Sequence, residues 1–169
     1  GARLLTLIHR ADKTDLADVA RAAMVDLRTA LSALDAQPVP LGDALADWRA
    51  EANERCAIAG VALHWRQPDG LPEKPLPAAS KAVLERALRE GITNALKHAR
   101  PSAISVQVAA EGARLTLDLT DDGQTPPPEQ WREGRGLRGM RQRLGELGGS
   151  LGLAAQPRGG SRLSLALML

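Results

Sequence analysis

The feature that most constrains the fold is a strict alternation of apolar and polar residues in four short segments. A period of two puts every second side chain on the same face of a β-strand, so each segment predicts a strand with one buried face. Glu111-Gly112 separates the first two segments and 157–160 separates the last two, which predicts two hairpins. The alternating apolar residues are Ile104, Val106 and Val108; Leu115, Leu117 and Leu119; Leu151 and Leu153; and Leu163, Leu165 and Leu167.

Helical periodicity fills the intervals around these strands. Apolar residues recur at helical spacing from 78 to 99, where Arg100-Pro101 ends the segment, and again from 137 to 147. A further strand is expected at 61–65, after an earlier helix. The order of these elements predicts an α+β fold, a two-layer sandwich with helices on one face of a mixed β-sheet. The residues expected on the buried face of the earlier helix are Leu41, Leu45, Trp48, Ala52 and Cys56.

The first 36 residues have a different pattern. Apolar residues between 15 and 35 follow a heptad seam, which predicts a helix that pairs with others in a bundle; an ordinary amphipathic helix is the alternative. Gln37-Pro38-Val39-Pro40 predicts a stiff joint after it. The chain begins in what reads as mid-helix, so we expect a piece of a longer protein. The seam residues are Leu16, Ala20, Ala23, Leu27, Ala30 and Leu34.

Composition excludes several classes of function. The net charge of the 169 residues is +2 and the aromatic residues are three Trp, so neither a basic nucleic-acid surface nor a stacking platform is indicated. Cys56 is the single cysteine and is expected to be a core residue. Because no apolar run approaches the ~18 residues of a membrane span, we expect a cytoplasmic domain without membrane contact.

Four polar residues of the helix at 78–99 are candidates for chemistry. Projected on an α-helix, Glu90, Asn94, Lys97 and His98 lie to one side, away from the apolar stripe. An Asn carbonyl gives a hard divalent ion an oxygen ligand without adding charge, a carboxylate one turn earlier holds a water or a proton, and a Lys attracts phosphate. The alternative is a solvated helix face with an Arg86–Glu90 ion pair.

Two further segments could bind a nucleotide. Gly134, Gly136 and Gly139 bracket a helix start, where backbone amides bind phosphate; a flexible loop before a capped helix is the alternative. Asp121 ends a strand beside Gly123 and could accept a hydrogen bond from an exocyclic amine, or it forms a simple turn.

In this order the segments resemble the ATP-binding domain of sensor histidine kinases, in the wider group that holds gyrase, Hsp90 and MutL. E-x-x-x-N-A-L-K-H-A at 90–99 resembles the Asn box of that family, and D-D-G at 121–123 resembles its first glycine box. G-R-G-L-R-G-M-R-Q-R-L at 134–144 resembles the second glycine box, in the form typical of the NarX- and DesK-like class.

The resemblance implies a Bergerat-type ATP-binding domain over 41–169, preceded at 1–36 by the end of a helical dimerisation hairpin. The phosphoacceptor pattern is missing around His9, which is therefore expected to be a bystander, with the acceptor helix upstream. The implied activity is phosphoryl transfer from ATP to a histidine outside the chain and on to a response regulator receiver domain, in a kinase that acts as a homodimer. Whether that kinase is membrane-anchored stays open.

The resemblance also implies roles for individual residues. Asn94 would bind Mg²⁺ with Glu90 supporting its water shell, Lys97 and His98 would face the phosphates, and Asp121 would hold the adenine amino group. Gly123 would lie at the edge of the adenine ring, and Ser161 would lie near the adenine. The lid hinge would be formed by Gly134, Gly136, Leu137 and Gly139.

One departure keeps two alternatives open. Thr125 stands where the first glycine box usually has a second glycine, which questions lid flexibility and affinity. The alternatives are an ATP-hydrolysing relative of the gyrase and MutL kind, in which Glu90 activates water, and a degenerate docking or dimerisation module that no longer binds ATP.

Overall fold

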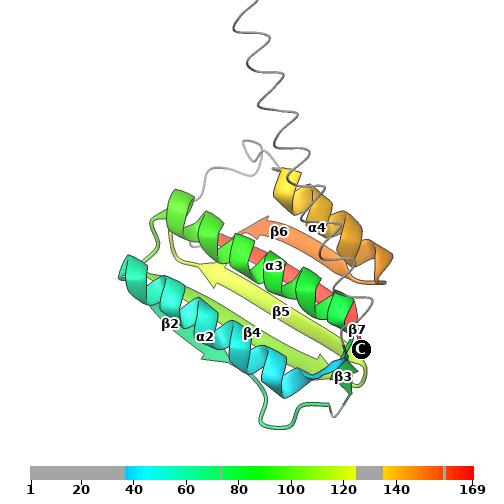
Figure 1. The fold of residues 1–169 in the computed structure, drawn as a ribbon. Helices are drawn as coiled ribbons and strands as arrows, with labels where there is room; N and C mark the ends of the chain where they lie inside the picture. The colour runs from blue at the N-terminus through cyan, green and yellow to red at the C-terminus, as the bar shows by residue number, and fades with distance from the viewer. Residues whose placement is uncertain (1–36, 73, 125–134, 158) are drawn as a thin grey trace, which may run out of the picture. The chain divides into compact units, whose positions relative to one another are not determined.

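Five strands form one mixed sheet in the computed structural model, which describes residues 37–72, 74–124, 135–157 and 159–169 (Figure 1). The predicted seam at 15–35 and His9 lie outside the described residues. The sheet has the order β2-β4-β5-β7-β6, with β2 and β4 parallel and all other neighbours antiparallel. Its strands are β2 Ala62–Arg66, β4 Ala103–Glu111, β5 Arg114–Asp121, β6 Ser150–Ala155 and β7 Ser161–Met168.

The helices that the structure describes within 37–169 cover one face of this sheet (Figure 1). They are α2 Leu41–Ala59, α3 Ala78–Asn94 with its continuation η1 Ala95–Ala99, and α4 Arg135–Glu146. The two-layer α+β prediction is confirmed. The hairpin between β4 and β5 turns through Gly112 and Ala113, one residue later than predicted, because Glu111 and Arg114 still pair.

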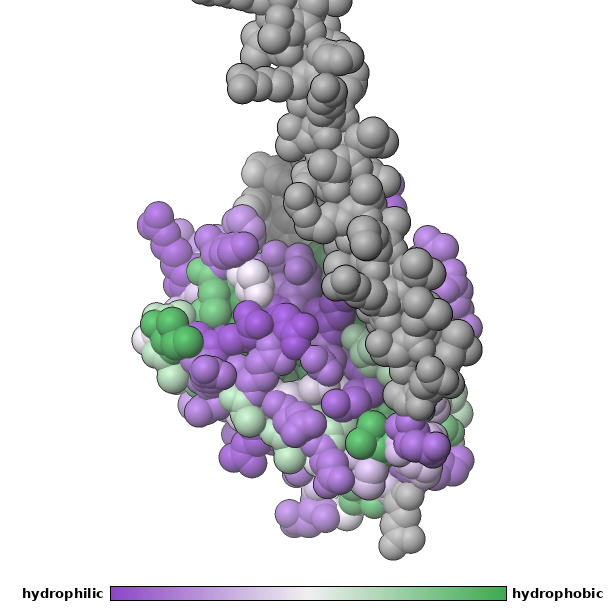
Figure 2. Space-filling model, in the orientation of Figure 1, coloured by the Kyte–Doolittle hydropathy of each residue, from purple (hydrophilic) through white to green (hydrophobic). Residues whose placement is uncertain are grey.

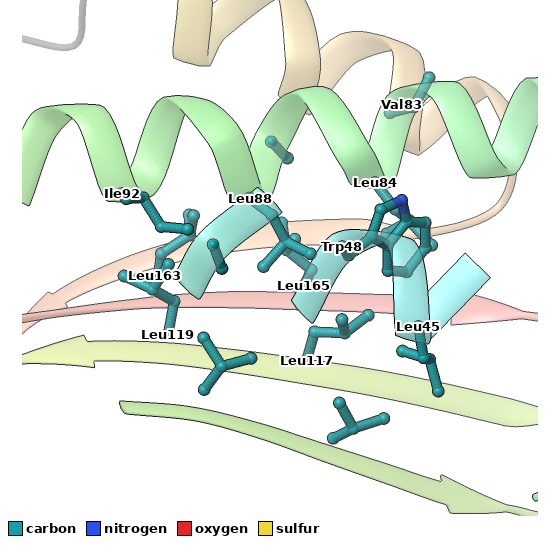
Figure 3. Close-up of a cluster of buried hydrophobic side chains, with 14 of the residues drawn as sticks. Leu45, Trp48, Val83, Leu84, Leu88, Ile92, Leu117, Leu119, Leu163 and Leu165 are labelled. Atoms are coloured by element: carbon teal, nitrogen blue, oxygen red, sulfur yellow. The ribbon is translucent and has the colours of Figure 1, made fainter. Parts of the chain in front are cut away.

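The core lies between the two layers (Figure 3). Leu84, Leu88 and Ile92 of α3 face Leu117, Leu119, Leu163 and Leu165 of the strands. The predicted buried face of α2 is confirmed, including Cys56, whose thiol pKa is raised by burial. Because alternate strand residues point away from this core, the opposite face of the sheet carries polar side chains such as the Asp118–Arg162 pair.

A second, two-stranded sheet was not predicted. The strands β1 Val39–Pro40 and β3 Pro75–Leu76 pair antiparallel, with Val39 opposite Leu76. The predicted joint at Gln37-Pro38-Val39-Pro40 therefore pairs with the segment Pro75–Leu76, just before α3. This pairing fixes the start of α2 beside the start of α3.

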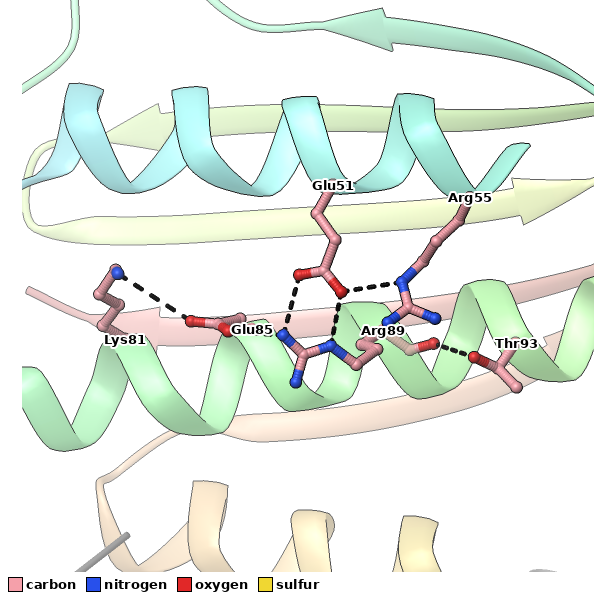
Figure 4. Close-up of polar contacts among 6 residues, drawn as sticks. All are labelled: Glu51, Arg55, Lys81, Glu85, Arg89 and Thr93. Carbon is pink, nitrogen blue, oxygen red and sulfur yellow. Dashed lines mark hydrogen bonds and ion pairs between the residues drawn. The ribbon is translucent and has the colours of Figure 1, made fainter. Parts of the chain in front are cut away.

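An ion-pair ladder joins the outer surfaces of α2 and α3 (Figure 4). Glu51 accepts hydrogen bonds from Arg89 Nε at 2.6 Å and from Arg55 Nε at 2.8 Å, and Arg89 also pairs with Glu85 at 2.7 Å. The hydrogen bond from Arg89, above all, lowers the pKa of the Glu51 carboxyl to about 2. The ladder residues and Trp48 line a small groove between the two helices, and none of the predicted site residues lines it.

The solvent face of the helices is mainly hydrophilic, with small separate hydrophobic patches (Figure 2). Ile58 and Met168 are the large apolar residues that the described surface exposes most, at 81% and 59%. Among the described residues, no helix combines the length and apolar character needed to cross a bilayer.

Candidate functional site

The polar edge of α3 faces the first turn of α4. Asn94 Nδ2 donates to Glu90 Oε1 across 3.4 Å, one turn apart on α3. A Cβ built on Gly136 would lie 3.4 Å from the same Glu90 oxygen, so the second glycine segment approaches this carboxylate directly. Two segments far apart in the sequence, the Asn box and the α4 start, are therefore neighbours in space.

The end of this helix is wider than predicted. Ala95–Ala99 forms a π-helix, with hydrogen bonds from residue i to i+5, instead of a last α-helical turn. The α-helical projection is therefore wrong for Lys97 and His98, although both are exposed at the end of the helix that carries Asn94. Short π-helical segments are frequent at functional sites.

The π-helix connects the Asn box to the first glycine box. The Ala99 carbonyl accepts a hydrogen bond from the Gln124 N–H at 2.7 Å. A Cβ on Gly123 would lie 2.3 Å from that carbonyl oxygen, so only glycine fits against the helix end. The turn after β5 is thereby packed against the end of the helix that carries Lys97 and His98.

Asp121 is the most elaborately bonded member of the site. It is 2% exposed, and its Oδ1 accepts from the Gly123 N–H at 2.9 Å. Its Oδ2 accepts from the Ser161 N–H at 3.1 Å and from the Ser161 hydroxyl at 2.6 Å. The structure thus brings together Asp121, Gly123 and Ser161, as predicted for the adenine end.

The bonding pattern decides what this end can recognise. An ionised carboxylate only accepts hydrogen bonds, so the Ser161 hydroxyl donates its hydrogen to Asp121. Towards a ligand, the hydroxyl oxygen can then act only as an acceptor. Asp121 Oδ1 also keeps accepting capacity beside its bond to Gly123. An edge that presents acceptors favours an amino group over a carbonyl oxygen.

Two residues near this end were missed by the sequence reasoning. Asp122 accepts hydrogen bonds from the Ser102 and Ala103 N–H groups and from the Ser102 hydroxyl, and the hydroxyl bond is the main cause of its lowered pKa. Gln156 donates to the Asp121 carbonyl oxygen at 2.9 Å. The Asp-Asp-Gly turn in the sequence could have indicated Asp122, whereas no local sequence pattern indicates Gln156.

The predicted lid hinge is described only in part. Gly134 lies outside the described residues, and so does Thr125. Gly136, Leu137 and Gly139 all lie inside α4, which begins at Arg135. Leu137 is partly buried against the core, so it anchors the first turns of α4 to the sheet layer.

The two residues that the resemblance assigns to a metal ion, Glu90 and Asn94, are in contact. Nucleotide-bound Mg²⁺ usually takes one or two protein oxygens and completes its shell with phosphates and waters. Asn94 and Glu90 are adjacent and half-buried, and because the amide nitrogen of Asn94 faces Glu90, its carbonyl oxygen points elsewhere. The described ranges contain no cluster of three or more His, Cys, Asp or Glu suited to a metal. These residues therefore fit an ion shared with a nucleotide.

The sequence of the chain is similar to those of known proteins. A family model described as histidine kinase-, DNA gyrase B-, and HSP90-like ATPase matches residues 79–169. The signal transduction histidine-protein kinase/phosphatase UhpB of Salmonella typhimurium is 37% identical over 105 residues, 62% of this chain and 20% of that protein. The nitrate/nitrite sensor protein NarQ of Escherichia coli is 38% identical over 95 residues, 55% of this chain and 17% of that protein. The chain thus spans about a fifth of the length of these relatives.

Solved structures share the fold. The histidine kinase domain of the blue-light activated kinase of Erythrobacter litoralis EL346 aligns with a TM-score of 0.63 and 20% identity, covering 79% of this chain and 65% of that one. Full-length ShkA in complex with AMPPNP aligns with a TM-score of 0.63 and 17% identity, covering 78% of this chain and 30% of that one. The chain belongs to the family of histidine kinase-, DNA gyrase B- and HSP90-like ATPases, and it carries the ATP-binding domain of sensor histidine kinases.

Proposed function

We propose that this domain binds Mg-ATP and transfers the γ-phosphoryl group to a histidine outside residues 1–169, in a two-component sensor kinase. The observation that carries the proposal is the series of contacts from Gly136 and Glu90, through the helix end at Ala99 and Gly123, to Asp121 and Ser161. Its two ends have the chemistry that the two ends of ATP require.

The base binds at the Asp121 end. Asp121 Oδ1 and the Ser161 hydroxyl oxygen accept hydrogen bonds from the exocyclic amino group of adenine, and Gly123 lies at the ring edge. Guanine and hypoxanthine carry a carbonyl oxygen at that position and would place an acceptor against acceptors. The domain therefore selects adenine nucleotides.

The phosphates bind at the Asn94 end. Asn94 is the protein ligand of Mg²⁺, and Glu90 holds a water of its shell. Lys97 and His98 lie exposed on the π-helix and attract the phosphates, and the first backbone amides of α4 at Gly136 bind phosphate oxygen. When bound, the ion neutralises charge on the phosphates.

The transfer is a substitution at the γ-phosphorus. An imidazole nitrogen of the acceptor histidine forms the new P–N bond while the bond from phosphorus to the bridging oxygen breaks and ADP leaves. Lys97 and His98 stabilise the charge on the transferred group. A second protomer and a response regulator receiver domain complete the pathway: the receiver takes the phosphoryl group from the histidine.

Calorimetric titration of the 169-residue chain with Mg-AMPPNP tests the nucleotide site. Asn94→Ala should weaken binding at least about tenfold, because an ion ligand is lost. Asn53→Ala is the matched control, since Asn53 lies exposed on α2, and it should leave the affinity unchanged. Equal affinities of wild type and Asn94→Ala would contradict the metal role.

Incubation with radiolabelled ATP tests where the acceptor lies. The chain alone should bind nucleotide and gain no acid-labile phosphate, and it should show no steady ATP turnover. A stable phosphohistidine on this chain would refute an external acceptor. Sustained hydrolysis lost in Glu90→Gln would instead favour the ATP-hydrolysing alternative.

A further inference from the structure

The side chain of Gln156 joins the ends of two strands. Its Nε2 lies 2.9 Å from the carbonyl oxygen of Asp121, at the end of β5, and 3.3 Å from that of Ser161, at the start of β7. Both neighbours are acceptors, so the nitrogen side of the amide must face them. Gln156 is thus a double donor between two segments that are far apart in the sequence.

The backbone of Gln156 closes the turn that carries Ser161. Its N–H donates to the Gly160 carbonyl at 3.0 Å, and its carbonyl accepts from the Gly159 N–H at 3.1 Å. The turn passes so close to β5 that a Cβ on Gly160 would lie 1.9 Å from the Asp121 carbonyl oxygen. One residue therefore both closes the 156–160 turn and ties it to Asp121.

Gln156 acts where the ladder between β5 and β7 stops, although Asp121 still pairs with Ile104 of β4 and Ser161 with Ala155 of β6. The antiparallel pairing of β5 with β7 runs from Arg114 opposite Met168 to Thr120 opposite Arg162. Asp121 and Ser161 are the next residues on each strand, beyond the last backbone pair. At that position the Gln156 amide bonds both main-chain carbonyls and takes the place of the missing ladder.

We propose that Gln156 is a positioning residue for base recognition, which fixes the spacing between the Asp121 carboxylate and the Ser161 hydroxyl. The inference rests on the proposed function, because these two groups are the ones assigned to adenine. Gln156 reaches main-chain carbonyls on both strands, so it sets where the two acceptors stand relative to each other. Loosening that spacing weakens the contact with an amino group and has little effect at the phosphate end.

Comparing the binding of ATP and of ITP tests the proposal, since ITP carries a carbonyl oxygen where adenine carries its amino group. In Gln156→Met, which keeps the length of the side chain without its donors, the Kd for Mg-ATP should rise about tenfold and the Kd for Mg-ITP should change less than about twofold. The ATP preference then falls about tenfold. Gln107→Met on the exposed face of β4 is the matched control and should keep both values.

Two further variants guard against a simple loss of folding. Gln156→Lys restores a donor between the two carbonyls and should recover most of the preference for ATP, whereas Gln156→Glu offers only acceptors and should lose it. An unchanged ATP-to-ITP ratio in folded Gln156→Met, or an equal loss of both nucleotides, would overturn the positioning role. If wild type binds neither nucleotide, the proposed function itself fails, which is a distinguishable result.

Discussion

Two polar clusters of the molecule use a carboxylate in opposite ways. In the α2–α3 ladder, Glu51 is bound by the guanidinium groups of Arg89 and Arg55 (Figure 4). At the end of β5, every hydrogen bond that the described residues give to the Asp121 carboxylate comes from a neutral group, an N–H or the Ser161 hydroxyl. The ladder lies at the surface, whereas Asp121 is almost completely buried.

The difference separates a stabilising pair from a binding group. When two arginines bind a carboxylate, its charge is neutralised and its lone pairs are occupied within the protein. A buried carboxylate held only by neutral donors is oriented and solvated but keeps accepting capacity, which suits a ligand that donates. Four predictions test this contrast, in order of decreasing effect.

The largest effect is expected from a glycine substitution beside Asp121, compared with one at the end of α2. Gly160 (φ +83°) and Gly60 (φ +69°), at the end of α2, are both left-handed. Gly160→Ala should lower the free energy of unfolding by about 4 kcal/mol and abolish ATP binding, since its Cβ meets the Asp121 carbonyl. Gly60→Ala meets nothing and should cost only the backbone strain, about 1 kcal/mol. Equal losses in urea denaturation would show that close packing at Gly160 is unimportant.

Neighbouring aspartates sharpen the contrast next. Asp121→Asn turns one acceptor atom into a donor that faces either the Gly123 N–H or Ser161, and it should weaken ATP binding by about 2 kcal/mol, about thirtyfold. Asp122→Asn, at the exposed clamp on Ser102, should lower stability by about 1 kcal/mol and leave the Kd unchanged. Calorimetry measures the Kd of both variants, and urea denaturation measures their stability. Similar Kd values for the two variants would contradict the binding role of Asp121.

The ladder should behave in the reverse manner. Glu51→Gln removes the charge that Arg89 and Arg55 share and should lower the free energy of unfolding by about 1 kcal/mol. The Kd for ATP should stay within about twofold of wild type, because the hydrogen bonds of Glu51 go to Arg89 and Arg55, which are not proposed site residues. A strong loss of ATP affinity in a folded Glu51→Gln variant would break the separation of the two clusters.

The smallest effect is a dependence on pH. The pKa of Glu51 is about 2 in the folded domain against an ordinary value of 4.5, so the folded state binds the proton less readily than the unfolded chain. The stability that Glu51 contributes is therefore complete above pH ~5 and is lost as the pH falls toward ~2. The difference in unfolding free energy between wild type and Glu51→Gln should shrink over that range. A constant difference from pH 7 to 3 would rule out this linkage.

Much of the fold was predictable because it depends on local periodicity. Alternation in β4, β5 and β7, the helical stripe of α3 and the buried face of α2 each follow from residues close in sequence, and the predicted sandwich, family and ATP-binding role are confirmed. The pairing of β1 with β3 was not predictable, because two proline-containing dipeptides carry no strand signal.

The site was predictable only as far as motifs reach. The Asn box and the second glycine box lie side by side, where Gly136 approaches Glu90 and Glu90 bonds to Asn94, and the roles of the motif residues are proposals. The π-helical turn at Ala95–Ala99 packs through Ala99 against Gly123, which follows β5, and the helical periodicity of the sequence gives no sign of it. Gln156 likewise acquires its role from strands that meet only in the folded domain.

The central place of β5 has a consequence for how a nucleotide comes and goes. β5 is hydrogen-bonded on both sides, by β4 and by β7, and Asp121 itself pairs with Ile104 of β4, so its displacement requires the end of the β4–β5 ladder to open. Lys97 and His98 instead lie exposed on the last turn of a helix, outside the sheet ladders. Under the proposed function, the exposed phosphate end should therefore release ADP first and the buried base end last.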